Sequence, residues 1–356
     1  MLHITTRRTL PPLLLISLFL TPIYGKDPAL PSVSVTDVNT VYEIGPHNAF
    51  TDMTWFKGKI YLAFRNCPDG HMVHPTSRII ILASTNGDDW KEVYTFRVRD
   101  RDTRDPHFVV FRDELFLYTG TWYCGEARPK DRNMNQMLGF GVKTSDGDVW
   151  TRPFELKGTY GHYVWRGATD SKSVYLCARR RRGFMEIPNL QRHDELVESR
   201  ILRSNDGVSF KDVGHFQLKY GDETSFQFRE NGEIQAVSRQ GGNRNAQLIS
   251  LTKPYNDPNV IDLGRYIGGP LLFYFDEHIL VSGRNIRDGR VYTNVSVLQN
   301  NRLYDLVDLP SSGDCSYPGM VALCPGCILV SWYSSHLKTN DGRSKTAIFT
   351  AKINIH

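Results

Sequence analysis

The sequence lacks an apolar stretch long enough to cross a bilayer. The run Leu10–Leu20 has eleven residues and no later stretch is long enough, whereas a transmembrane helix needs about 20. A large basic excess is also missing, because 43 Lys and Arg face 38 Asp and Glu, a formal net charge of +5. Nucleic-acid binding needs basic residues gathered on one face, so this balance does not predict it. With 23% charged and 40% hydrophobic residues, the composition excludes a disordered chain, a collagen and a coiled coil.

No glycine-rich phosphate loop and no cluster of metal ligands stands out, so the sequence predicts neither a cofactor nor a metal site. Cysteines are few, six in all, and two of them, Cys324 and Cys327, enclose a Pro-Gly turn between apolar runs. This pattern predicts the tip of a hairpin that holds either a small disulfide or two free thiols. A redox motif would need a helix after the first cysteine, and zinc would need a second pair of ligands.

Residues 1–25 have the features of a secretory signal peptide. Arg7 and Arg8 form a basic start, the apolar run Leu10–Leu20 follows, and Gly25 offers a small residue for cleavage before Lys26. We expect the mature chain, residues 26–356, to be secreted to the periplasm or the extracellular space, with no membrane span after removal of the signal. An uncleaved anchor is the weaker alternative.

Three turns of one kind recur at intervals of 60 residues. They are Ser84–Trp90, Thr144–Trp150 and Ser204–Phe210, and each reads hydroxyl residue, any residue, Asn or Asp, Gly, two further residues and an aromatic. In such a turn the Asn or Asp caps the turn's own amides, the glycine supplies a positive φ, and the aromatic packs beneath. Three matches at a constant spacing predict a repeated β-hairpin unit.

A second repeat lies between these turns. Four strand-like runs end in arginine at one register, and two further runs occupy the same place without it: the arginines are Arg65, Arg179, Arg239 and Arg284, and the other runs are Phe116–Gly120 and Ile328–Trp332. Each unit opens with a short strand that carries a polar or special residue, at Asn48–Asp52, Asp105, Arg166, Glu223, Gly268–Pro270 and Tyr317. Six units of short strands predict an all-β fold, a six-bladed β-propeller over residues 26–356.

In a propeller the innermost strand of each blade lines the axis. We therefore expect the opening residues and the strand-end arginines to converge on one mouth, although each arginine taken alone could be a solvated strand end. An N-terminal strand near Asp37–Ile44 is expected to join the last blade and close the ring, which removes exposed sheet edges.

These features resemble the sialidases (neuraminidases), and most closely the secreted bacterial-type exo-alpha-sialidase-like proteins. The turn repeat resembles their Asp-box, and the six units resemble their propeller, over about Val41 to Ile353. Further elements are similar to the family: Arg104-Asp105-Pro106, Glu223 with Arg239 sixteen residues on, and Arg284 with Tyr317 thirty-three residues on.

The resemblance implies a role for each matching residue. Tyr317 matches the nucleophile and Glu223 the carboxylate that activates it. Arg239 and Arg284 match two of the three arginines that hold the carboxylate of sialic acid. Asp105 matches a pocket aspartate, and Arg65 an additional pocket arginine.

The chemistry explains these residue types. A sialic acid glycoside carries a carboxylate on its anomeric carbon, which would repel a carboxylate nucleophile, whereas a tyrosine is neutral and a neighbouring glutamate can take its proton. Guanidinium groups bind a carboxylate through paired hydrogen bonds. The alternatives are that Tyr317 is a packed core residue and that Glu223 is an ion-pair partner of Arg239.

The sequence also departs from the family. The first clamp arginine is absent from His47–Asp52, so Arg65 or Arg166 would have to complete the clamp. The general acid should lie in the loop Cys67–Pro75, where Asp69 is too early and His71, or failing that His74, lies nearer the expected place. Histidine is a possible acid because its pKa lies near neutrality, but both histidines could equally be solvated loop residues.

We therefore expect a secreted exo-glycosidase that hydrolyses a terminal acidic sugar, with sialic acid as the leading candidate, with retention of configuration. The expected partner is a sialylated or other acidic glycan, and no nucleic acid. The alternatives are a glycosidase for another acidic sugar and a non-catalytic carbohydrate-binding propeller. Intact Tyr317 and Glu223 favour an enzyme, whereas the missing arginine favours a binder or a changed specificity.

Overall fold

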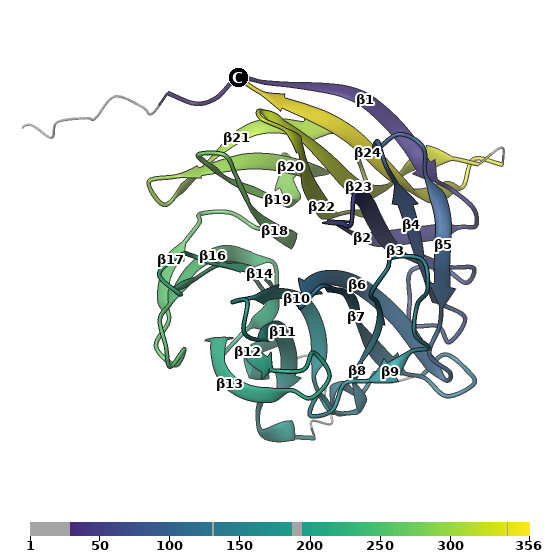
Figure 1. Ribbon diagram of the computed structural model, residues 1–356, viewed down its shortest axis with the longest axis vertical. Helices are drawn as coiled ribbons and strands as arrows, with labels where there is room; N and C mark the ends of the chain where they lie inside the picture. Colours follow the sequence, from purple (N-terminus) through teal and green to yellow (C-terminus); the bar gives the residue numbers. More distant parts are fainter. Residues whose placement is uncertain (1–28, 130–131, 187–193, 340) are drawn as a thin grey trace, which may run out of the picture.

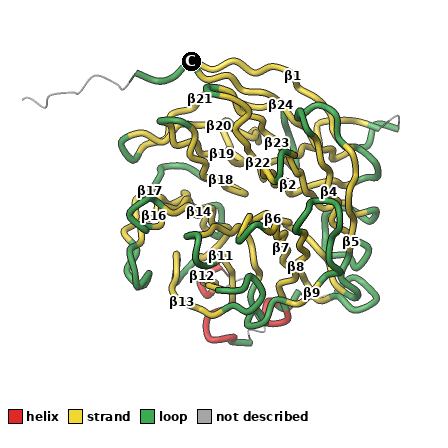
Figure 2. The backbone as a smooth tube through the Cα atoms, viewed as in Figure 1, coloured by secondary structure: helices red, strands yellow, loops and turns green. Residues whose placement is uncertain are grey.

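The computed structural model of the protein describes residues 29–129, 132–186, 194–339 and 341–356 (Figure 1). The expected signal peptide, residues 1–25, lies outside the described residues. Nearly all regular structure is β-strand, and the helical parts are three-residue turns at Met134–Gln136, Arg182–Phe184 and Asp194–Leu196 (Figure 2). Within the described ranges, no helix has the length and apolar character that a membrane crossing requires.

Four sheets contain four antiparallel strands each, paired in chain order. Their strands are β6 (Arg101–Phe111), β7 (Glu114–Tyr123), β8 (Leu138–Thr144) and β9 (Phe154–Glu155); β10 (Tyr163–Thr169), β11 (Val174–Arg181), β12 (Val197–Ser204) and β13 (Lys211–Gln217); β14 (Gly221–Phe228), β15 (Ile234–Gln240), β16 (Arg244–Leu251) and β17 (Asn259–Asp262); and β18 (Gly268–Phe275), β19 (His278–Arg287), β20 (Arg290–Gln299) and β21 (Arg302–Leu309). The sheets surround a central axis, so the predicted all-β propeller is confirmed (Figure 1).

A fifth sheet contains eight strands. They are β22 (Cys315–Cys324), β23 (Cys327–Lys338), β24 (Ser344–Ile355), β1 (Val33–Tyr42), β2 (His47–Phe56), β3 (Lys59–Cys67), β4 (Arg78–Ser84) and β5 (Lys91–Phe96). One parallel pair, His47 with Thr346, joins β2 to β24 and merges two groups of four strands. The prediction of six separate blades is therefore corrected: the hydrogen bonds form four four-stranded blades and one eight-stranded sheet.

The two ends of the described chain meet in this eight-stranded sheet. Strand β1 pairs antiparallel with β24, with Val33 opposite Ile355 and Tyr42 opposite Ile348. The expected N-terminal strand near Asp37–Ile44 thus exists, shifted a few residues towards the N-terminus. It covers the edge of β24 and fastens the start of the propeller to its end.

The Cys324–Cys327 turn is a hairpin tip, as the sequence predicts. Cys324 and Cys327 lie opposite each other in the register of β22 and β23, and Gly326 in the turn has a φ of 69°. Both cysteines are free thiols, which selects the second of the two expected states.

The three repeated turns share one hydrogen-bond pattern. In the second of them, Asp146 Oδ1 accepts hydrogen bonds from the N–H groups of Asp148 and Val149 at 2.9 and 2.8 Å, and Thr144 Oγ1 accepts from Gly147 at 2.8 Å. The turns at Ser84 and Ser204 repeat these bonds. The aromatic residue packs below, as Trp150 stacks on Tyr94 with ring centroids 5.8 Å apart.

Six innermost strands contact one another in a ring around the axis, in the order β2, β6, β10, β14, β18 and β22. Each of them loses register with its neighbour at the same level, between Ala49/Asp52, Arg104/His107, Val164/Gly167, Gly221/Thr224, Gly268/Leu271 and Ser316/Gly319. Four residues inside these breaks have positive φ: Phe50, Asp105, Gly269 and Tyr317. Bulges re-aim side chains and are frequent beside active sites, so this level of the axis is where a site is expected.

Substituting one turn glycine tests this packing. Gly147 has a φ of +87°, and a Cβ there would lie 2.0 Å from the buried Tyr61 hydroxyl, whereas Gly58 has a φ of +77° and nothing within 4 Å. We expect Gly58→Ala to cost about 1 kcal/mol through its φ alone. Gly147→Ala should cost at least about 2 kcal/mol, because the ring must also move. Urea unfolding of both variants measures this, and equal losses would contradict the packing.

Candidate active site

A tyrosine of β22 and a glutamate of β14 are in contact at the level of the bulges, although their strands belong to different sheets. The hydroxyl of Tyr317 donates a hydrogen bond to Glu223 Oε1. Glu223 Oε2 accepts two further bonds, from Arg239 Nη1 and from the Gly269 N–H, each at 3.0 Å. Glu223 is 2% exposed and Tyr317 is 6% exposed. The sequence-predicted pair of Tyr317 and Glu223 is thus in direct contact.

The surroundings of this pair set its protonation. Burial raises the pKa of Glu223, but the charges of Arg239 and Arg179 and the hydrogen bond from Tyr317 outweigh it and lower that pKa to about 2. Burial, together with the charge of Glu223, raises the pKa of Tyr317 well above its usual value. At neutral pH the site holds a carboxylate and a neutral phenol. The phenolic hydrogen therefore faces an oxygen that can accept it when the phenol attacks an electrophile.

The strand-end arginines of β11 and β15 flank the pair. Arg239 Nε lies 3.3 Å from Asp222 Oδ2, and Arg179 bonds to the other oxygen of Asp222. The side chains of Arg179 and Arg239 are 19% and 22% exposed. Both side chains are thus mostly buried, and their charges compensate those of the buried acids Asp222 and Glu223.

Arg284 approaches from β19. Its Nε donates to the carbonyl of Cys315 at 2.8 Å, and its Nη2 lies 3.2 Å from Asp314 Oδ1 and 3.1 Å from the hydroxyl of Tyr333. The ring of Tyr333 lies 5.9 Å from that of Tyr317. Through its hydrogen bond to Tyr333, Arg284 is therefore next to the tyrosine–glutamate pair.

His71 joins the site through Asp314. His71 Nδ1 lies 2.8 Å from Asp314 Oδ2, and His47 Nε2 lies 3.1 Å from the same oxygen. The ring of Phe50 packs between His71 and Tyr317, with centroids 5.8 and 4.8 Å away. The side chain of His71 is 48% exposed. Of the two loop histidines that the sequence offers as an acid, His71 is thus the one that lies in this network.

His47, His71 and Asp314 are metal-ligand types, and their ligating atoms lie within 4.8 Å of one another. A guanidinium can only donate, so Arg65 Nη1, 3.2 Å from His47 Nδ1, makes that nitrogen an acceptor. Burial lowers the pKa of His47 to about 4, so its ring is neutral at pH 7. Its single hydrogen is then on Nε2, facing Asp314, which leaves no lone pair there for a metal. The cluster fits a hydrogen-bond network and not a metal centre.

Asp105 lies in the bulge of β6 and accepts a hydrogen bond from the hydroxyl of Tyr163 on Oδ2. Its other oxygen, Oδ1, is buried and has no hydrogen-bond partner among the described residues. Burial raises the pKa of Asp105 to about 6, with the charge of Glu223 adding to the effect and that of Arg104 opposing it. Asp105 thus belongs to the same electrostatic cluster as Glu223, as a partly protonated acid near neutral pH.

The structure does not bring Arg65 to the open site. Arg65 is 0% exposed and is used within the protein, with Nε 3.0 Å from Asp102 Oδ1 and two bonds to the carbonyls of Gly70 and Met72. The expectation that Arg65 contacts a substrate is therefore corrected: it supports the loop that carries His71.

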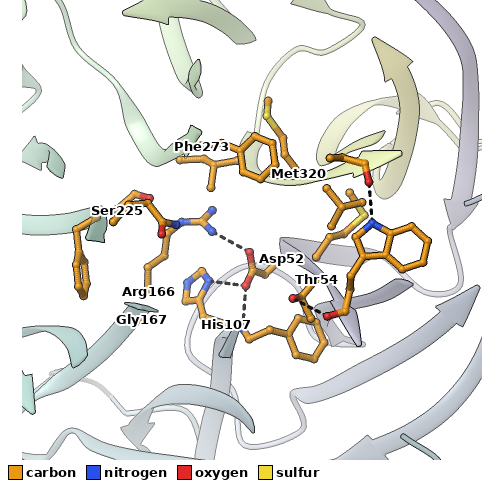
Figure 3. Close-up of a pocket in the computed structure, with 16 residues that line it drawn as sticks. Asp52, Thr54, His107, Arg166, Gly167, Ser225, Phe273 and Met320 are labelled. Atoms are coloured by element: carbon orange, nitrogen blue, oxygen red, sulfur yellow. Dashed lines mark hydrogen bonds and ion pairs between the residues drawn. The ribbon is translucent and has the colours of Figure 1, made fainter. Parts of the chain in front are cut away.

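Arg166 is also withdrawn from the site. Its Nη1 lies 2.8 Å from Asp52 Oδ1, while Nε and Nη2 donate to the carbonyls of Pro270 and Pro318 at 2.9 and 2.6 Å. Figure 3 shows this pair and His107 among the side chains that line a cavity. The cavity has a volume of about 400 Å³ and is lined by the later halves of the inner strands. All three nitrogens of the Arg166 guanidinium group thus have partners within the protein, and the expectation that Arg166 completes the clamp is corrected.

Several residues of the site carried no recognisable sequence signal. Asp314 and Tyr333 organise Arg284, and Phe50 occupies the bulge in the segment where the family would supply an arginine. Arg104 stands next to Asp105 and donates to the carbonyls of His71 and Met72 at 2.8 and 3.2 Å. By contrast, the sequence does mark Arg104, through the Arg-Asp-Pro element, and Arg179, which is one of the four strand-end arginines expected at this mouth.

The propeller resembles those of solved sialidases. A protein of unknown function from Dyadobacter fermentans DSM 18053 superposes with a TM-score of 0.75 at 16% identity, over 92% of this chain and 100% of its own. Trypanosoma rangeli sialidase in complex with the inhibitor DANA gives a TM-score of 0.63 at 13% identity, over 91% of this chain and 60% of its own. Phage phi92 endosialidase gives 0.65 at 8%, over 90% and 69%.

At these identities the likeness shows the fold, an all-β propeller of the kind found in sialidases. The chain spans about 60% of the length of the Trypanosoma rangeli enzyme. Neither a family model nor a curated protein matches the sequence.

The raised pKa of Asp105 predicts how stability depends on pH. The folded protein keeps a proton on Asp105 that the unfolded chain loses above about pH 4, so stability falls as pH rises from about 4 to 6. Asn at this position has no charge to bury and can still accept from Tyr163. We expect Asp105→Asn to be more stable than the wild type at pH 7, by up to about 3 kcal/mol, with the difference vanishing below about pH 4. Urea unfolding from pH 4 to 7 measures it, and a variant that is less stable throughout would contradict the assignment.

Proposed function

We propose that the protein is a retaining exo-glycosidase that removes a terminal acidic sugar, with sialic acid as the leading substrate. The observation that carries this proposal is the hydrogen bond from Tyr317 to Glu223, with Arg239 on the same carboxylate, at the bulged level of the axis. Two neighbours with the same fold bear the name sialidase and one the name endosialidase. These names describe the neighbours, and the substrate of this chain is proposed from its own site.

The reaction proceeds in two steps. Tyr317 Oη attacks the anomeric carbon while its proton passes to Glu223 Oε1, and the bond from that carbon to the leaving oxygen breaks as His71 protonates the oxygen. Water then attacks the same carbon, His71 takes its proton, and Tyr317 leaves and regains its proton from Glu223. Two displacements at one carbon retain its configuration.

Arg239 and Arg284 bind the carboxylate of the sugar. Among the described contacts, Arg239 uses Nε and Nη1, and Arg284 uses Nε and Nη2. Each guanidinium thus keeps one terminal nitrogen for a ligand, and both side chains are about one-fifth exposed. Phe50, which is 3% exposed, packs against the ring of Tyr317 beside this clamp.

The finer features of the fold belong to the same proposal. The eight-stranded sheet consists of two antiparallel groups of four strands that one parallel pair links, so six inner strands surround the axis without forming six separate blades. The three capped turns fit the Asp-box pattern. Residues 1–25 are proposed to direct secretion, where glycoconjugates would be encountered.

Replacing the nucleophile tests the mechanism directly. Tyr317→Phe removes one oxygen with little change in shape, so we expect turnover of an aryl glycoside of sialic acid to fall at least about 1,000-fold, with binding retained. Tyr118→Phe is the matched control, since it also removes a buried hydroxyl, bonded to the carbonyl of Gly207, and should keep full turnover. Full activity of Tyr317→Phe would refute the nucleophile. A wild-type protein that binds an acidic sugar without turnover would favour the carbohydrate-binding alternative.

Arg284 tests whether the sugar is acidic. Arg284→Met removes a charged hydrogen-bond donor from the clamp, so binding of an acidic sugar should weaken by about 1.5–3 kcal/mol, roughly ten- to hundred-fold in Kd. Calorimetric titration with sialic acid measures the loss, and a neutral sugar is the control ligand. An unchanged Kd for the acidic sugar would remove Arg284 from the clamp.

A further inference from the structure

We propose that Asp314 is a positioning residue that orients His71 as the acid and base of the reaction, so that a histidine–aspartate pair stands where the family would place a single carboxylic acid. This inference rests on the proposed function and adds to it the residue through which His71 acts.

Four donors surround Asp314. His47 Nε2 and His71 Nδ1 approach Oδ2 at 3.1 and 2.8 Å, while Arg284 Nη2 and the Tyr333 hydroxyl approach Oδ1 at 3.2 and 2.9 Å. Burial raises the pKa of Asp314, but the bonds from His47 and His71 and the nearby positive charges outweigh it and hold the pKa far below its usual value. Asp314 is therefore a permanent carboxylate with both oxygens occupied, and its position is fixed from four sides.

The hydrogen of each histidine follows from its partners. Arg65 can only donate, so His47 accepts on Nδ1 and directs its Nε2–H to Asp314. His71 presents Nδ1 to the same carboxylate oxygen, which can only accept. Its hydrogen is therefore on Nδ1, and Nε2 is the nitrogen that remains for proton transfer, on a side chain that is 48% exposed. That is the arrangement in which a carboxylate fixes the tautomer of a histidine for proton transfer.

The backbone of the His71 loop is held independently. Asp102, which is 0% exposed, pairs with both Arg65 and Arg104, at 3.0 and 2.6 Å. These two arginines donate to the carbonyls of Gly70, His71 and Met72. The side chain of His71 is thus aimed by Asp314 while its main chain is fixed by two buried guanidinium groups. A loop histidine on a merely solvated surface would need neither.

His71 returns to its starting protonation state over the two steps. In the first step the imidazolium of His71 gives its Nε2 proton to the leaving oxygen and becomes neutral, with the remaining hydrogen on Nδ1 facing Asp314. In the second step Nε2 takes a proton from the attacking water and the imidazolium returns. The carboxylate of Asp314 stays ionised throughout and stabilises the positive ring.

The test compares leaving groups, because an acid matters most when the leaving oxygen is a poor one. We expect His71→Ala to lower kcat/KM at least about 100-fold on an alkyl glycoside of sialic acid and less than about 10-fold on the nitrophenyl glycoside. Asp314→Asn should show the same selectivity with about a 10-fold loss on the alkyl glycoside. Added imidazole should rescue His71→Ala and not Asp314→Asn. Asp305→Asn is the control. Asp305 lies on the outer strand β21, where the substitution removes its ion pairs with Arg265 and Arg287, and kcat/KM should stay unchanged on both glycosides.

Equal losses on both glycosides, or none, in Asp314→Asn would overturn the positioning role while leaving the glycosidase proposal standing. A wild type that turns over no acidic glycoside would instead overturn the proposed function. Nitrogen-15 spectra of the histidine rings separate the two cases without turnover. They should place the hydrogen of His71 on Nδ1 in the wild type and redistribute it in Asp314→Asn, with His47 unchanged. An unaltered His71 ring in Asp314→Asn would refute the inference at any level of activity.

Discussion

The site depends on one buried charge, the carboxylate of Glu223. An ionised carboxylate that is 2% exposed is costly unless it is paired and hydrogen-bonded. The protein meets this requirement with Arg239, the Gly269 N–H and Tyr317, which come from three other strands. Satisfying the charge therefore fixes β14, β15, β18 and β22 relative to one another. The same bonds hold the phenol of Tyr317 in place, so the contacts that stabilise the fold here also position the proposed nucleophile.

The architecture follows from local chemistry that is visible in the sequence. The capped turns at Ser84, Thr144 and Ser204 and the Pro-Gly tip at Cys324–Cys327 lie where the pattern of residues predicts them. The number of separate sheets is not predictable from the sequence. The single pair His47–Thr346 merges two groups of strands, and neither segment contains a sequence pattern that indicates this pairing.

The sequence predicts at which end of its strand each site residue lies. It does not predict where along the axis the side chain lies or which partners it finds there. Arg65 has the same register as Arg239, yet Asp102 and the carbonyls of its own neighbouring loop capture it. Arg166 lies inside the break between Val164 and Gly167, and its guanidinium pairs with Asp52 instead of reaching the clamp. Asp314 was not predictable, because its importance comes from four donors that converge only in the folded chain.

The most direct measurement is the identity of the covalent intermediate. A fluorinated sialyl donor that slows the second displacement should leave the sugar attached to the protein, and peptide mass spectrometry locates the attachment. If Tyr317 is the nucleophile, a single adduct forms on its oxygen, and in Glu223→Gln that adduct is absent or forms far more slowly. Turnover of the natural glycoside together with an adduct on another residue, or with no adduct at all, would contradict it.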